Sequence, residues 1–453
     1  MQTRDLGLFD QAMYNSLHGR FLEMSLRFPE GGSLFAEHLY LIMILILPIY
    51  ALFPTPYTLF FLQALAGGAG AFVIFLLAKD HLRSELAATC FALAYLLHPS
   101  LESANLNLFR WGFHPDNFFS PLLLCALYSL QKDKRYLAAS FWVLALAVDE
   151  KYAILLTALG LYLLIVKREI RFGAIMTFLS IFWFITATQM IVPHFLGAKR
   201  PWYLSTMGEI SKSERGLGAL ALALVRYLLF VIGPLLLLPL ADLPSLSVII
   251  PTVLTYLIAR ASHYAAPMIP NSWHVNAVLP IVFLSAILGM QRLVRLVRNP
   301  LKRGTLITVG SLLVLIAAGS TAYWLGPLPL SRGIHPLRYA VDEEIAQSVK
   351  EVRSLIPHEA SLAASRYIGS NFTHQRTILR LRTRSSRFAT VDLAMWKRAD
   401  YVLIDLNRHL WKNRLWRDKF GQELFHFLQR SEEYEVLYSK NKIWLFKKIA
   451  PTF

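Results

Sequence analysis

The sequence predicts an all-α polytopic membrane protein, with about ten transmembrane helices plus interfacial helices, that carries a small α/β domain at its C-terminal end. Hydrophobic residues make up 55% of the 453 residues, and the mean hydropathy is +0.44. Apolar runs recur from about residue 35 to residue 325, separated by short polar turns, as in multi-pass helical membrane proteins. Beyond about residue 330, short apolar runs alternate with polar helical stretches, a pattern typical of a small α/β domain.

Residues 1–56 are predicted to form an external loop with interfacial amphipathic helices. Read as a helix, its beginning places Leu6 and Phe9 at helical spacing on an apolar face. The simplest interpretation of this helix is a surface amphipathic helix whose acids are solvated. Residues 36–53 are apolar but short, and Pro48 interrupts them, so we expect them to lie in the interface without crossing.

Residues 57–325 are predicted to form the transmembrane helical domain, with ten apolar runs that cross the bilayer. The runs are approximately 57–78, 85–98, 117–130, 136–149, 152–167, 172–193, 221–240, 246–260, 275–291 and 304–325. Several are shorter than the roughly 20 residues that span a hydrocarbon core, so we expect their ends to reach the interface or a polar cavity.

Basic residues predict the orientation of these crossings. With ten crossings, four clusters fall on one side of the membrane, at 79–83, 132–135, 167–171 and 292–303. Basic loops face the cytoplasm, so we expect a cell (plasma or inner) membrane protein whose C-terminal domain is non-cytoplasmic. This placement accounts for much of the formal net charge of +17, which therefore does not indicate a nucleic-acid partner.

The C-terminal domain is predicted to occupy residues 336–450 as an α/β unit. Its expected elements are a helix at 342–355, apolar runs at 361–365 and 401–405, a basic helix at 410–430, and strands at 434–438 and 442–446. Alternation of short apolar strands with helices favours a sheet covered by helices.

Ionisable residues gather in the loops predicted to lie on the non-cytoplasmic side. Asp149, Glu150 and Lys151 form a very short polar turn between two apolar runs, where unpartnered charges are costly. Pairing among themselves, or with Arg110, would explain them without any function. Acids and histidines from several loops converge on that one side, which favours a functional site.

Known metal and phosphate motifs are missing from the sequence. It contains no HExxH motif, its histidines have no paired ligand spacing, and its glycine clusters lie in or beside apolar runs. Cys90 and Cys125 both lie within apolar runs and do not predict a disulfide. We therefore predict no metal site from motifs, and the question of a divalent metal stays open.

Short motifs along nearly the whole chain carry a family resemblance. They are Asp5-Leu-Gly-Leu-Phe-Asp10-Gln11, Gly19, Phe35-Ala-Glu-His38, Phe113-His114-Pro115, Glu150 and Ala399-Asp-Tyr-Val-Leu-Ile-Asp405. In these motifs the chain resembles an uncharacterised family of bacterial and archaeal multi-pass membrane proteins, a domain of unknown function. That family is similar in fold to the GT-C membrane glycosyltransferases.

The resemblance implies a transferase that moves a sugar from a polyprenyl-phosphate donor to an acceptor at the outer face of the membrane. In GT-C enzymes an acidic residue of the first external loop acts as the catalytic base or orients the acceptor. Asp5 is the position most similar to it. GT-C proteins place a transmembrane helix ahead of this residue, whereas this sequence begins at Met1 without one. An inactive truncated family member is therefore one alternative.

These considerations give a predicted site in one cavity open to the outer face. The expected catalytic residues are Asp5, Asp10, Asp116 and Glu150, and the expected substrate- or phosphate-binding residues are His38, Arg110, His114 and Lys151. Within the cavity we expect Asp5 nearest the opening and Asp10 turned away, because five residues of helix separate their directions. The expected partners are membrane lipid and a polyprenyl-phosphate-linked sugar. The other alternative is a transporter or lipid-handling protein without catalysis, since intramembrane acids and histidines also serve proton relays.

Overall fold

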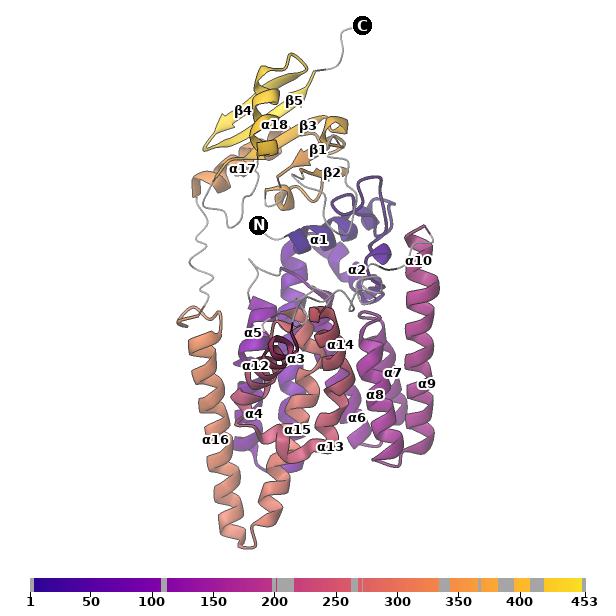
Figure 1. Ribbon diagram of the computed structural model, residues 1–453, viewed down its shortest axis with the longest axis vertical. Helices are drawn as coiled ribbons and strands as arrows, with labels where there is room; N and C mark the ends of the chain where they lie inside the picture. The colour runs from indigo at the N-terminus through magenta and orange to yellow at the C-terminus, as the bar shows by residue number, and fades with distance from the viewer. Residues whose placement is uncertain are drawn as a thin grey trace.

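In the computed structural model, the helices form one elongated bundle and the strands form a small sheet beyond one end of it (Figure 1). The structure describes residues 4–106, 112–197, 201, 216–261, 268–270, 272–333, 343–365, 368–381, 395–407 and 419–449. Between the bundle and the sheet lies the N-terminal helix α1 (Arg4–Leu17) (Figure 1).

Helix α1 is buried along almost its whole length. Leu6, Phe9 and Met13 are each at most 4% exposed, and so is the polar Asp10 on another face. The C-terminal domain covers the side that the membrane helices leave open, so that a Cβ on Gly7 would lie 3.3 Å from Thr373 Cγ2. The interpretation of α1 as a surface helix with solvated acids was therefore wrong for this part of the chain.

Helix α2 (Ile42–Leu52) follows the short helix η1 (Leu34–Ala36). Its 11 residues span about 16 Å, roughly half of a hydrocarbon core, and Pro48 lies inside it. Leu45 and Leu52 are 54% and 72% exposed, an apolar face of the kind that contacts lipid. An interfacial position of residues 36–53 stays a prediction.

Each of the ten predicted apolar runs forms a helix or a chain of short helices. The single helices are α3 (Pro56–Leu82), α4 (Glu85–Leu96), α6 (Phe119–Gln131), α7 (Arg135–Leu146), α8 (Tyr152–Ile165), α15 (Leu279–Leu296) and α16 (Pro300–Leu325). The composite ones are α9 (Ile170–Thr186) with η3 (Ala187–Ile191) and α10 (Val192–Phe195), α12 (Leu217–Ile232) with η5 (Gly233–Leu235), and η6 (Leu238–Asp242) with α13 (Leu243–Leu246), η7 (Ser247–Ile249) and α14 (Ile250–Ala261). Six are long and apolar enough to cross a membrane, so the described chain does not confirm ten crossings.

The boundary between the seventh and eighth runs differs from the predicted one. The helical chain breaks at Leu236 and Leu237, whose φ angles are 55° and 60°, and not between residues 240 and 246. Pro234 and Pro239 flank the break, and neither can donate a backbone hydrogen bond. The result is a chain of short helical turns, η6, α13 and η7, at membrane depth.

Three short elements join the membrane helices near the α1 end of the bundle. They are α5 (Pro99–Leu106), η2 (Pro115–Phe118) and η9 (Trp273–Ala277). Helices α8 and α9 then pack closely through glycines, since a Cβ on Gly173 would lie 2.6 Å from the backbone nitrogen of Leu164. Small residues let membrane helices approach in this way, and here they fix the helix that begins directly after Lys151.

The C-terminal domain contains a five-stranded mixed sheet of order β2-β1-β3-β5-β4. Its strands are β1 (Ser361–Ala364), β2 (Thr377–Arg380), β3 (Tyr401–Asp405), β4 (Tyr434–Lys440) and β5 (Ile443–Lys448). Strand β1 pairs in parallel with β2 and β3, whereas β5 is antiparallel to both β3 and β4. All five residues of β3 are buried, as its continuous apolar sequence predicts for a central strand.

The two faces of this sheet have different partners. Leu362 and Leu403 belong to the large apolar core that includes α1 and the membrane helices, together with Val352 of α17 (Glu343–Leu355). The alternate residues Ala363 and Val402 pack with α18 (Lys419–Arg430). The predicted α/β character is confirmed, although β2 was not predicted and residues 408–418 of the expected basic helix lie outside the described residues.

Candidate functional site

The centre of the candidate site is the turn between α7 and α8. Asp149 and Glu150 are 0% and 1% exposed, and they sit between two apolar helices as the sequence predicts. Buried carboxylates are stable only when hydrogen bonds or cations compensate them. The partners of Glu150 come from a distant part of the chain, whereas Asp149 is paired mainly with Lys151 of the same turn.

The segment before α2 supplies the partners of Glu150. His38 Nδ1 lies 2.8 Å from Glu150 Oε1, and the backbone nitrogen of Leu39 donates to Glu150 Oε2 over 2.8 Å. A third bond, from Ile42 N to Ala147 O, ties the same two segments together. The first external segment is thus fixed to the α7–α8 turn by a charged pair and two backbone donors.

Lys151 joins two further carboxylates. Its Nζ lies 2.5 Å from Asp116 Oδ1 and 2.8 Å from Asp149 Oδ2. Tyr152 OH donates to the same oxygen of Asp116 over 2.7 Å. The side chain of Lys151 is 23% exposed, so this cation retains access to the space above the buried acids.

The neighbouring charges set the protonation states of this network. Burial disfavours the His38 imidazolium, but the carboxylates of Asp149 and Glu150 outweigh it and raise the pKa of His38 to about 9. Burial raises the pKa of Asp149 to about 6, although Lys151 opposes it. Burial also favours the neutral form of Asp116, but the nearby Lys151 cation outweighs this effect and lowers the pKa of Asp116 to about 2. At neutral pH, His38 and Lys151 are therefore cations and Asp116 is an anion.

Above this network lies a cavity of about 270 Å³. Its wall includes Asp5, Leu8, Phe9, Met24, Arg27, Leu34, Glu37, His38, Tyr40, His114, Lys151, Trp273 and His274. Asp5 contributes a carboxylate that is 31% exposed, the most open of the predicted acids, and its Oδ2 lies 3.7 Å from His114 Nε2. The His114 ring stacks on Trp273 with a centroid separation of 3.8 Å and an interplanar angle of 8°.

Three cations face this cavity together with Asp5. Arg27 Nε lies 2.6 Å from Glu37 Oε2, so the guanidinium is held by one carboxylate while its side chain stays 18% exposed. His38 and Lys151 complete the set. Of the two carboxylates in the wall, Glu37 is paired with Arg27, whereas Asp5 lies beside His114. A wall with several fixed cations and the Asp5 carboxylate suits a ligand that carries a phosphate and a hydroxyl group.

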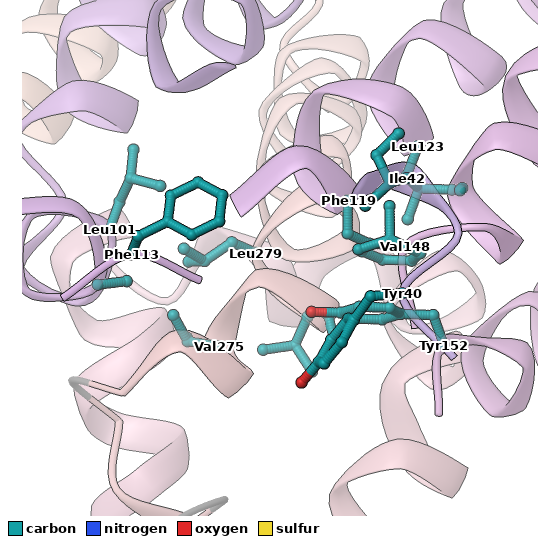
Figure 2. Packing of buried hydrophobic residues seen from close by; sticks show 14 of the residues in the cluster. Tyr40, Ile42, Leu101, Phe113, Phe119, Leu123, Val148, Tyr152, Val275 and Leu279 are labelled. Atoms are coloured by element: carbon teal, nitrogen blue, oxygen red, sulfur yellow. The ribbon is translucent and has the colours of Figure 1, made fainter. Parts of the chain in front are cut away.

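Apolar side chains form the floor under the polar network. Tyr40, Phe119, Val148 and Tyr152 lie together in the core (Figure 2), and the rings of Phe119 and Tyr152 stack at 3.7 Å. This packing excludes water from below, which strengthens the electrostatic interactions of the charged groups above it.

One group within the network has the donor set of a metal site. His38, Asp149 and Glu150 each offer a ligand atom, and these atoms all lie within 4.8 Å of one another. One nitrogen and two carboxylate oxygens would fit a divalent cation. In the described structure the His38 imidazolium and Lys151 already compensate both acids, so a cation would have to displace their ion pairs.

Most of the predicted site residues lie at this cavity or directly beneath it. Asp5, His38, His114 and Lys151 line it, whereas Asp116 and Glu150 contact its lining residues from below. Asp10 is the exception, and Arg110 lies outside the described residues. The expectation that Asp10 lines the same cavity was wrong, although the expectation that it turns away from Asp5 agrees with the structure.

Asp10 instead connects α1 to α2 and to the C-terminal domain. Tyr50 OH donates to its Oδ1 over 2.6 Å, and Thr373 Oγ1 donates to its Oδ2. His374 Nε2 lies 3.2 Å from the same Oδ2, and the His374 ring stacks on Tyr14 at 3.9 Å. Since the carboxylate is fully buried, its chemistry is structural.

Sequence reasoning missed five residues of the cavity wall that carry a polar group. They are Arg27, Glu37, Tyr40, Trp273 and His274. Trp273 and His274 end a loop predicted to lie on the same side as Asp5, and adjacent aromatic rings in such a loop were the available signal. Arg27 gave no comparable signal, since a lone arginine in a polar loop is ordinary.

The fold and the site together define a multi-pass membrane protein with a charged cavity between its N-terminal segment and the loops at one end of the helical bundle. A family model described as predicted membrane protein (DUF2079) matches residues 1–445, so the chain belongs to this family. The family's function is not established, and the predicted resemblance to an uncharacterised membrane protein family is confirmed. A comparison with curated proteins finds no match to the chain.

Proposed function

We propose that this protein is a membrane glycosyltransferase that transfers a sugar from a polyprenyl-phosphate donor to an acceptor hydroxyl at the outer face of the membrane. The observation that carries the proposal is the cavity in which the accessible Asp5 carboxylate faces Arg27, His38 and Lys151. A base for a hydroxyl proton and cations for a phosphate are the two requirements of this reaction.

In the proposed step the acceptor oxygen attacks the anomeric carbon of the donor sugar as its proton moves to Asp5. The bond from that carbon to the phosphate oxygen breaks, and the electron pair leaves with the polyprenyl phosphate. A single displacement of this kind inverts the configuration at the anomeric carbon. His114, 3.7 Å from Asp5 Oδ2, would orient the carboxylate in the course of proton transfer.

The buried residues act through those that line the cavity. Glu150 holds His38, and Asp116 and Asp149 hold Lys151, so that both cations have fixed positions before the substrate arrives. Preorganised charges need no rearrangement when the phosphate becomes an anion, which is the main electrostatic contribution to such reactions. Trp273, stacked on His114, offers an aromatic face for the sugar ring.

Replacing the base tests this proposal. In proteoliposomes supplied with a polyprenyl-phosphate sugar and an acceptor, Asp5→Asn should lower the rate of transfer by about 10²–10⁴-fold. Asp80→Asn is the matched control, because Asp80 pairs with Lys132 at the other end of the bundle. Unchanged transfer by the Asp5→Asn protein would refute the role of Asp5.

A transporter or lipid-handling protein is the second candidate. The observation that favours it is the chain of buried ionisable groups from His38 through Glu150 and Asp149 to Lys151 and Asp116, which resembles a proton relay. Uptake of a labelled substrate into proteoliposomes without release of polyprenyl phosphate would support this candidate over the transferase.

A further inference from the structure

We propose that a second cavity, at the end of the bundle away from the C-terminal sheet, binds an anionic membrane phospholipid. This cavity measures about 280 Å³ and lies among α3, α6, α8, α13, η7 and α15. It shares no lining residue with the cavity around Asp5. The inference is therefore independent of the proposed transferase activity.

The walls of the cavity are apolar along its depth. They include Leu127, Leu159, Leu163, Ile281, Leu284 and Leu288. A water-soluble anion gains nothing from such walls, whereas an acyl chain is stabilised by them. Two hydroxyl groups line the cavity, Tyr162 OH and Ser245 Oγ, and they form a hydrogen bond with each other over 3.0 Å.

The mouth of the cavity is polar and carries Lys167 and Arg135 together with Asp133 and Glu169. Arg135 forms a 2.8 Å ion pair with Glu169. Within the described residues Lys167 forms no ion pair, and its Nζ lies 5.8 Å from the centroid of the Tyr162 ring. A cation fixed over an aromatic ring at the entrance of an apolar cavity suits a phosphate headgroup.

Charge around the mouth selects an anionic headgroup over a zwitterionic one. The turns at 79–85, 131–135 and 167–171 contain eight lysines and arginines but four aspartates and glutamates. Three of these acids already pair with a cation of the same turns, in Asp80–Lys132, Glu85–Lys79 and Glu169–Arg135. The net charge of these three turns is therefore positive. A zwitterionic headgroup, which carries a cation beside its phosphate, is attracted to them less strongly than an anionic headgroup.

The irregular backbone beside the cavity supports the same inference. Leu238 to Ile249 form short turns instead of one helix, and Ser245 and Val248 from these turns line the cavity. Irregular backbone at membrane depth is found where protein or a cavity shields it from lipid. A bound lipid would fill the space that this break creates.

Lipid titrations of the purified full-length protein in detergent, followed by native mass spectrometry, test the proposal. The probes are phosphatidylglycerol, phosphatidylcholine and inorganic phosphate. We expect phosphatidylglycerol to bind roughly tenfold more tightly than phosphatidylcholine, and inorganic phosphate not to compete with it. Equal affinities for the two lipids, or full competition by phosphate, would overturn the proposal.

Two variants locate the lipid, each with a matched control. Lys167→Gln should weaken phosphatidylglycerol binding about fivefold without changing phosphatidylcholine binding, and Lys302→Gln should change neither. Leu284→Trp should fill the cavity and abolish binding of both lipids. Leu293→Trp, at a 38% exposed position of the same helix, should abolish neither. Unchanged binding by the Lys167→Gln protein, which alters only an exposed side chain, would contradict the assignment even if Leu284→Trp fails to fold.

Discussion

Lys151 illustrates how single residues of the site gain their properties from partners far away in the sequence. The two carboxylates that hold it come from its own turn and from η2, and His38 arrives from the N-terminal segment. Removing one partner of such a buried group typically costs 3–5 kcal/mol, because the other charge is left uncompensated. The network is therefore a structural requirement for the cavity as well as a source of its charge.

Glu102 gives a test of burial at the residue scale. It lies on α5 with 2% exposure, and neither carboxylate oxygen has a hydrogen-bond partner among the described residues. Burial raises the pKa of Glu102 to about 8, so the folded protein holds a proton that the unfolded chain releases above about pH 4.5. Stability from this group is fully present below about pH 4.5 and is lost as the pH rises toward 8.

We therefore expect Glu102→Gln to stabilise the protein at pH 8 by on the order of 2 kcal/mol and to have little effect at pH 4.5. Thermal unfolding in detergent at several pH values measures this difference. Glu169→Gln, at an exposed ion pair, serves as the control and should change the unfolding temperature little at either pH. The same stabilisation at both pH values would show that ionisation of Glu102 is not the cause.

At the scale of residues, the sequence predicted which charged loops come together, but not every partner that their side chains contact. The acids of the α7–α8 turn, His38 and His114 do converge, as expected from the prediction that their loops lie on one side. Asp10 could not be assigned, since its partners Thr373 and His374 follow it by more than 360 residues. The position of a residue along a helix predicts the direction of its side chain, but it does not predict which residues that side chain contacts.

Among the elements, α1 is the one that connects the parts of the molecule. It presents Asp5 to the cavity, while Asp10 on another face binds α2 and the C-terminal domain. A second set of bonds runs from Gln11 Nε2 to Ser25 Oγ, which in turn accepts from Ile378 N of β2. The position of Asp5 therefore depends on how the C-terminal domain docks.

We expect Asp10→Asn to loosen this docking, because Tyr50 and Thr373 donate to different oxygens of Asp10 and an amide keeps only one of these acceptors. An unsatisfied buried donor costs about 1–3 kcal/mol. Hydrogen exchange followed by mass spectrometry should show faster exchange in α1 and in residues 368–381, but not in β4 and β5. Asp400→Asn, which removes an acceptor for Ser361 within the C-terminal domain, should leave α1 unchanged. Equal exchange of α1 in the wild-type and Asp10→Asn proteins would refute this role of Asp10.

The boundaries of helices and strands were predictable where the amino-acid composition changes. They were not predicted where only the backbone conformation changes. The observed α16 begins four residues before its predicted run and ends at the same residue. The leucines at the break, Leu236 and Leu237, carry no signal themselves, and the signal available was the flanking Pro234 and Pro239. Strand β2 was missed because only Ile378 and Leu379 of its four residues are apolar, which is too short a run to indicate a strand.

At the scale of the whole molecule, the bundle separates two sets of charged groups. Helix α1, which carries Asp5, lies at the end near the sheet, and the basic turn between α15 and α16 lies at the other end (Figure 1). Helix α16 connects the two ends, from the turn before Pro300 to the approach of the C-terminal domain. The charge pattern predicts that the sheet is outside the cell and the basic turns are inside.

Cysteine labelling tests this orientation. In a background without Cys90 and Cys125, Lys440→Cys should react with a membrane-impermeant maleimide in intact spheroplasts. Lys302→Cys should react only after permeabilisation, because both side chains are exposed but lie at opposite ends of the molecule. Labelling of the Lys302→Cys protein alone in intact spheroplasts would show that the predicted topology is inverted.

The most direct measurement of the central claim is the lipid that the protein carries out of its own membrane. If the cavity holds a polyprenyl-phosphate sugar and Asp5 is the base, the Asp5→Asn protein should bind this donor but not consume it. Native mass spectrometry of gently purified protein should then show intact donor on the Asp5→Asn protein and mainly polyprenyl phosphate, or an empty site, on the wild type. Replacing Arg27 by Gln should reduce the bound polyprenyl lipid in both backgrounds. If neither protein carries any polyprenyl lipid, and added donor fails to bind either one, the proposed transferase site is contradicted.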